Sequence, residues 1–249
     1  MSAATILEQV ESLRARVHRV QGSAEQRERR VLSALAPLFP TGALRAGAVY
    51  GVTGSTTLAM ALLAAASADG DWCGVVGVPE FGVEAAAQLG VALDRVVLVP
   101  APGRRWVTVV AAMADVLGMV AVRPTAPVYD AEAARLVARF RQHGGTLVAL
   151  GPWPQCEARL EVVDSTWVGV GAGHGHLAGR QGTVQAVGRD ARVRQARLWL
   201  PGTDARVAPV VPVAPVVRVT EVVRVTEVPA PAGETPDVRV LAPTVTGAA

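Results

Sequence analysis

Small residues that can hold a phosphate cluster where a short apolar run gives way to a helical pattern. The order is Gly51-Val52-Thr53-Gly54-Ser55-Thr56-Thr57, followed by leucine and several alanines. A strand, a glycine turn and a helix can bind phosphate, because backbone N–H groups at the helix start point at the anion. The phosphate-binding consensus, however, is G-x-x-x-x-G-K-[ST]. Here the loop is two residues shorter and Ser55 stands in the lysine position, so any such site is degenerate.

The chain also lacks the cation that such a loop needs. All 24 basic residues are arginine, and no lysine elsewhere can reach in between the β- and γ-phosphates. The helix start, with the Thr56 and Thr57 hydroxyls, could still bind an anion weakly. The alternative is a plain connection between strand and helix that serves folding alone. The sequence predicts no cofactor and no metal site.

Two further positions bear on nucleotide chemistry. A carboxylate should end a buried strand to hold the magnesium shell, but the residue after Val120-Ala121-Val122 is Arg123. Another carboxylate should polarise the attacking water, and Glu80 is a carboxylate that follows the buried run at residues 74–78. Because Arg123 would repel magnesium, and because phosphoryl transfer depends on electrostatic stabilisation, we predict no catalytic residue. Arg123 could instead take the space that a phosphate would occupy.

The elements that position these residues follow from the apolar pattern after Gly47. Continuous apolar runs alternate with helical stretches, which is typical of a parallel sheet with helices on both faces. The fold class is therefore α/β, and residues 162–200 are expected to extend the sheet with antiparallel strands. The expected strands are 48–52, 74–78, 96–99, 119–122 and 146–150, and the expected helices are 56–68, 83–89, 106–117 and 131–143.

A helical arm is expected at residues 1–39, before a core at 40–201. Thr5 and Glu8 form a capping box, and the apolar seam that follows could grip a partner or pack on its own domain. A second helical piece runs up to Pro40. The seam consists of Ile6, Val10, Leu13, Val17 and Val20, and the second piece carries Val31, Leu35 and Leu38 on one side.

Residues 202–249 are rich in proline and valine and are expected to form a flexible tail. The hexapeptide V-R-V-T-E-V occurs twice in succession, at residues 217–222 and 223–228. It could add a strand to the sheet edge of a partner. The alternative is a low-complexity duplication without a ligand.

Other polar groups give weaker signals. Arg192 and Arg194 could contact nucleic acid, but a solvated hairpin face is the favoured interpretation, and the net charge of +3 is only mildly basic. His174 and His176 would be half of a metal site that no further cluster completes. Trp106 is expected to anchor the start of its helix. The two cysteines, Cys73 and Cys156, have no zinc spacing.

The order of these segments resembles the RecA-like core. The similarity lies in "GALRAGAVYGVTGSTTLAMALLA", "VVGVPEFGVEAAAQLGVALDRVVLVP" and "MADVLGMVAVRP". With "DAEAARLVARFRQHGGTL", "VGVGAGHGHLAGRQGTV" and "RQARLWLP", the chain is similar to the actinobacterial ImuA-prime type of RecA-like protein. The RecA resemblance implies that Glu80 stands in the place of the catalytic glutamate and Arg123 in that of the metal-binding carboxylate. The ImuA-prime resemblance implies a scaffold in damage-induced (SOS) mutagenesis and translesion synthesis. The implied partners are an ImuB-like Y-family adaptor and, through it, a DnaE-type polymerase and the sliding clamp.

Several alternatives share this fold. A SulA-like inhibitor of cell division also looks like RecA without the phosphate loop. A divergent ATPase with arginine in place of lysine and a DNA-binding RecA paralogue are further alternatives. The seam from Ile6 to Val20 could also serve self-association. No secretory signal is visible, so a cytoplasmic protein, associated with the nucleoid when engaged, is expected.

Overall fold

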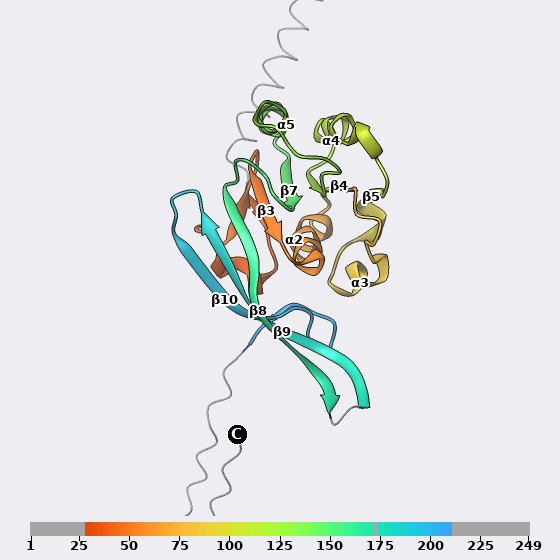
Figure 1. Cartoon of the computed structure of the whole chain (residues 1–249), viewed down its shortest axis with the longest axis vertical. Coiled ribbons are helices and arrows are strands. Elements are labelled where there is room, and N and C mark those ends of the chain that lie inside the picture. The colour runs from red at the N-terminus through yellow and green to blue at the C-terminus, as the bar shows by residue number, and fades with distance from the viewer. Residues whose placement is uncertain (1–27, 172–173, 211–249) are drawn as a thin grey trace, which may run out of the picture. The chain divides into compact units, whose positions relative to one another are not determined.

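A nine-stranded sheet forms the centre of the computed structural model, which describes residues 28–171 and 174–210 (Figure 1). Six adjacent strands of this sheet are parallel to one another, and the three strands beyond them extend the sheet in the antiparallel direction. The parallel strands and the antiparallel extension are thus confirmed. The order across the sheet is β11 (Ala208–Pro209), β10 (Val193–Trp199), β9 (His174–Gly188), β8 (Ala158–Gly171), β3 (Val49–Thr53), β7 (Thr146–Leu150), β6 (Met119–Val122), β4 (Cys73–Val76) and β5 (Val96–Val99).

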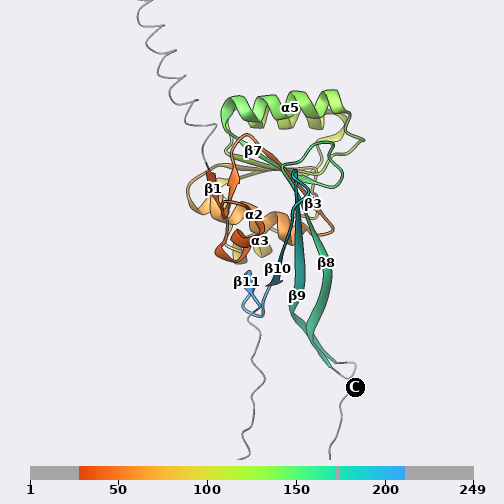
Figure 2. The same ribbon diagram turned by 90° about the vertical axis from the view of Figure 1, so that its left-hand side faces the viewer.

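Helices cover both faces of the parallel part, as the apolar runs predict. The helices α2 (Thr56–Ala68) and α3 (Val83–Gln88) lie on one face, and α4 (Trp106–Ala114) and α5 (Asp130–His143) lie on the other (Figures 1 and 2). The strands alternate between the two cores: Val148 of β7 packs on the α2 side, and Leu147 packs on the α4 and α5 side. No helix within the described ranges is long and apolar enough to cross a membrane.

The stretch before Pro40 differs from the expected helical piece. Residues Glu28–Arg30 form strand β1, which pairs antiparallel with β2 (Ala43–Arg45), and a short 3₁₀ helix, η1 (Ser33–Leu38), follows. The prediction of an α-helix here is wrong, because Pro37 lies inside the stretch and cannot donate a helical hydrogen bond. The apolar side was read correctly, however: Leu35 and Leu38 are buried in the same core as α2.

The segments at either end of the predicted core also join the sheet domain. Contacts of η1 with β10 and the pairing of β11 with β10 attach residues 33–38 and 208–209 to the sheet. The seam residues Ile6, Val10, Leu13, Val17 and Val20 lie outside the described residues, as does the hexapeptide repeat.

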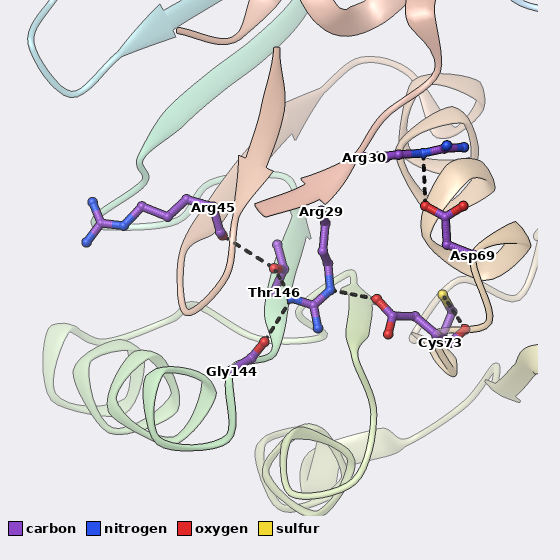
Figure 3. Close-up of polar contacts among 8 residues, drawn as sticks. Arg29, Arg30, Arg45, Asp69, Cys73, Gly144 and Thr146 are labelled. Carbon is purple, nitrogen blue, oxygen red and sulfur yellow. Dashed lines mark hydrogen bonds and ion pairs between the residues drawn. The ribbon is translucent and has the colours of Figure 1, made fainter. Parts of the chain in front are cut away.

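A largely buried arginine fastens β1 to the core (Figure 3). Nη1 of Arg29 donates to the carbonyl oxygen of Gly144 at 2.8 Å and to Thr146 Oγ1 at 3.4 Å. Its Nε lies 3.0 Å from Asp71 Oδ2, and the side chain is only 11% exposed. One guanidinium therefore joins β1 to the turn before β4 and to the junction of α5 with β7. The neighbouring pair of Arg30 with Asp69 has the same 3.0 Å distance, but the arginine side chain is 76% exposed.

The contrast between these two arginines yields a stability prediction. The change Arg29→Met should lower the free energy of unfolding by about 2 kcal/mol, because it leaves buried acceptors without a donor. The matched control, Arg30→Met, removes an exposed ion pair and should cost less than about 1 kcal/mol. Urea unfolding followed by circular dichroism measures both. Equal losses of unfolding free energy in the two variants would show that the buried contacts of Arg29 stabilise the fold no more than the exposed ion pair does.

Candidate functional site

The first glycine of the phosphate-loop pattern lies inside a strand. Gly51 is in the middle of β3, paired with Ala149 of β7 and Arg159 of β8. A Cβ there would lie 3.2 Å from the sulfur of Cys156, so the close approach of that side chain favours glycine. The turn between β3 and α2 is reduced to Gly54, which has a φ of +74°, and Ser55. A turn this short offers fewer backbone N–H groups than a phosphate-binding loop does.

Ser55, in the lysine position, caps the helix that follows it. Its backbone is extended, and its hydroxyl accepts a hydrogen bond from the N–H of Leu58 at 3.1 Å. This is the usual interaction of an N-cap residue, and it satisfies one of the N–H groups that a helix start leaves free. A structural role for Ser55 is therefore sufficient to explain why serine stands here.

Arg123 bridges the other two positions that the sequence singled out. Its Nη1 donates to Glu80 Oε1 in an ion pair, and its Nη2 donates to Thr56 Oγ1 at 3.4 Å. The hydrogen bond from Arg123 is the main reason that the pKa of Glu80 is lowered from its ordinary value. The guanidinium thus lies against the start of α2, where a phosphate would meet the helix. Thr57, the remaining residue of the pattern, is partly buried in the first turn of α2.

A tight contact between two loops brings Arg123 and Glu80 together. The N–H of Arg123 donates to the carbonyl of Val76, at the end of β4, at 2.9 Å. Gly77 follows with a φ of +73°, and a Cβ there would overlap the carbonyl oxygen of Arg123. Only glycine at position 77 lets the backbone come this close to the carbonyl of Arg123. The loop that carries Glu80 can therefore lie directly beside the end of β6.

A cavity of about 970 Å³ opens at the carboxyl ends of β3, β6 and β7. This is the edge at which open α/β sheets bind ligands, and the volume is typical of a small-molecule site. Prolines and Trp153 give it an apolar wall, and its charged residues are Arg123, Asp130 and Arg159. The full lining is Val52, Gly54, Ser55, Thr56, Arg123, Pro124, Ala126, Pro127, Val128, Asp130, Leu150, Gly151, Pro152, Trp153, Pro154 and Arg159.

Both arginines of this cavity are bound to other groups of the protein. Arg123 is engaged by Glu80, and Nη2 of Arg159 donates to the carbonyl of Trp153 at 2.8 Å. An incoming phosphate would have to compete with these internal acceptors. The cavity is therefore built more for an apolar group than for a triphosphate.

Sequence reasoning missed Arg159 and Trp153. Trp153 is 2% exposed, and its ring packs edge-to-face on Trp106 with centroids 6.4 Å apart. Trp106 is itself 3% exposed, which confirms that it anchors the start of α4. The one available signal was the run Pro152-Trp153-Pro154 directly after a buried strand, at the edge where ligands bind.

Arg192 and Arg194 lie in different settings. The side chain of Arg192 is 77% exposed and pairs with Asp190 at 3.4 Å. Arg194 is half-buried and lines a second cavity of about 510 Å³ together with Arg189 and Tyr50. Burial raises the pKa of that tyrosine to about 12, although its hydroxyl accepts a hydrogen bond from the N–H of Arg45. The two arginines therefore do not form one uniform basic surface.

The remaining candidates show no catalytic environment. His176 is exposed, and the side chain of His174 lies outside the described part of the chain. Within residues 28–171 and 174–210, no group of three or more His, Cys, Asp or Glu side chains could hold a metal ion. Burial raises the pKa of Cys73 to about 12 and also raises that of Cys156, so neither thiol is activated as a thiolate.

Comparison with known proteins points to a mycobacterial relative. Residues 37–155 match the family model of the MT3502 N-terminal domain. An uncharacterized protein of Mycobacterium tuberculosis (strain ATCC 25618 / H37Rv), Rv3395c, is 35% identical over 131 residues. The match covers 49% of this chain and 62% of that protein, so the chain spans less than two thirds of its relative's length. The region that matches the MT3502 domain contains Ser55, Glu80 and Arg123.

The Arg123–Glu80 pair makes a prediction about pH. Because the pKa of Glu80 is lowered in the folded protein, the pair stabilises the fold above the ordinary carboxyl pKa and is lost as the pH falls through the lowered value. In the variant Arg123→Gln, the Glu80 pKa should rise towards about 4.3. Carboxyl NMR titration measures it. The control Arg159→Gln, in the wall of the same cavity, should leave it unchanged, and an unshifted Glu80 in Arg123→Gln would contradict the assignment.

Proposed function

We propose that the protein is a non-catalytic RecA-like accessory factor of error-prone translesion DNA synthesis, of the ImuA-prime type. In this proposal it acts as a scaffold induced by DNA damage, through contact with an ImuB-like Y-family adaptor. The adaptor would link it to a DnaE-type polymerase and the sliding clamp. The matches to the MT3502 domain and to the mycobacterial protein fit this family but say nothing about the process itself.

The ion pair between Arg123 and Glu80 carries the proposal. These are the two positions at which a RecA-type ATPase would need a metal-binding carboxylate and a free catalytic glutamate. Here one is a cation, the other is neutralised by it, and the same cation reaches Thr56 at the helix start. Binding of a magnesium nucleotide would have to break these contacts in a chain that has no lysine to replace them.

The same features favour a scaffold over an enzyme on this fold. At the edge where chemistry would occur, Arg123 and Arg159 are bound by other groups of the protein, and Ser55 caps the helix that follows it. Such a core can still act by presenting a folded surface to which another protein binds. The apolar seam from Ile6 to Val20 is the segment proposed to hold the adaptor.

The absence of catalysis is tested with purified full-length protein. ATP turnover in the presence of magnesium and single-stranded DNA should equal that of the blank, and Glu80→Ala should change nothing. A measurable turnover that disappears in Glu80→Ala would overturn the proposal and support the divergent ATPase. Arg159→Ala serves as the matched control for changes near the cavity.

The partner is tested by co-purification from cells with damaged DNA. The full chain should recover the Y-family adaptor, and Leu13→Asp combined with Val17→Asp should reduce that recovery at least tenfold. The matched change Arg14→Asp with Arg16→Asp alters neighbouring positions off the seam and should have little effect. Recovery of the tubulin-like division protein in place of the adaptor would overturn the proposal and favour the SulA-like alternative.

A further inference from the structure

The two edges of the nine-stranded sheet are protected unequally. At one edge lies β11, which has only two residues and includes Pro209. Short edge strands and edge prolines are devices that stop other chains from adding a strand. At the other edge lies β5, Val96–Val99, whose sequence V-V-L-V has no charge and no proline. Within the described residues, no strand pairs with its outer side.

The side chains of β5 offer an apolar surface on both sides of this open edge. Val96 packs against the core on the α2 side, and Val99 packs against the core on the α4 side. The two middle residues, Val97 and Leu98, are each 37% exposed. A strand laid along β5 would bond to its free backbone groups and cover these two side chains.

The chain itself contains a segment with the properties of such a strand. Residues 216–228, between Pro215 and Pro229, are free of proline and contain both copies of V-R-V-T-E-V. In an extended conformation, Val217, Val219, Val223 and Val225 would share one side with Glu221 and Glu227, since alternate residues of a strand do so. Valine and threonine also favour strands. The repeat lies outside the described residues, and each copy of it offers one pair of valines that could cover the apolar side chains of β5.

We propose that the V-R-V-T-E-V repeat binds the β5 edge of a second copy of this chain by adding a strand to its sheet. The two interacting parts differ, so the contact is head-to-tail and can link more than two copies. This inference does not depend on the proposed function. It assigns a self-association surface at Val97 and Leu98 and a ligand segment at residues 216–228.

Chain length favours a second copy over the same one. Nine strands leave eight spacings of roughly 4.8 Å, so β11 and β5 are separated by about 38 Å across the sheet. The chain from Val210, next to β11, to Val217 can span at most about 24 Å. The first hexapeptide therefore falls short of the β5 edge of its own copy, whereas the second, which begins at Val223, has a reach of about 44 Å and only just spans that distance.

The test uses the full chain and two complementary variants. The edge variant, Leu98→Lys, places a charge on β5, and the tail variant, Val219→Pro with Val225→Pro, removes backbone donors from both hexapeptides. The control for the edge is Val193→Lys on β10, an exposed valine at the far side of the sheet. The control for the tail is Ala214→Pro with Ala230→Pro, outside the proline-free run. Analytical ultracentrifugation over a range of concentrations measures self-association, and urea unfolding verifies that each variant folds.

The expected result is association of the wild type that weakens at least tenfold in both variants and persists in both controls. A mixture of the edge and tail variants should form dimers with one copy of each, because together they retain one intact edge and one intact repeat. A monomeric wild type would overturn the proposal, as would unchanged association of the tail variant, which would indicate pairing of β5 with β5. If Leu98→Lys fails to fold, Val97→Lys tests the same edge.

Discussion

Burial of the parallel strands on both faces is the constraint on which the rest of the structure depends. The inner strands are runs of four or five residues that are almost entirely apolar, and they gain stability only if helices cover both sides. The pairs α2–α3 and α4–α5 supply that cover, and β-α connections then bring all carboxyl ends to one edge. This arrangement places the residues after β3, β4 and β6 beside one another, although Glu80 and Arg123 are 43 residues apart in the chain.

In this lysine-free chain, two arginines connect segments that are far apart in the sequence. Arg29 contacts Asp71 and Gly144 in two loops and Thr146 at the start of β7, and Arg123 contacts a carboxylate in a further loop and a hydroxyl in α2. A planar guanidinium with five N–H donors can serve several acceptors at once, which a single ammonium does less readily. The same property ties β1 to the core and joins the end of β6 to Glu80 and to the start of α2.

The sequence was sufficient for the alternating strands and helices, because long apolar runs leave few other interpretations. It failed before Pro40, where the apolar spacing suggested a helix and Pro37 produced a 3₁₀ turn. Gly51 was expected both inside the strand at 48–52 and as the first glycine of a phosphate loop, and β3 confirms only the strand. The contacts of Arg29 and Arg159 could not be predicted, since each depends on backbone carbonyls that only the folded chain brings into range. The pairing of Arg123 with Glu80 required the contact at Gly77, which no local pattern encodes.

The ion pair of Arg123 and Glu80 also makes the state of one residue depend on the other. A change of Arg123 to aspartate alone would set two carboxylates side by side, with no cation between them until a metal arrived. The two negative charges would repel each other, and the pKa of Glu80 would rise above its present lowered value. Arg123 therefore decides both the charge of Glu80 and the position in which its loop is held.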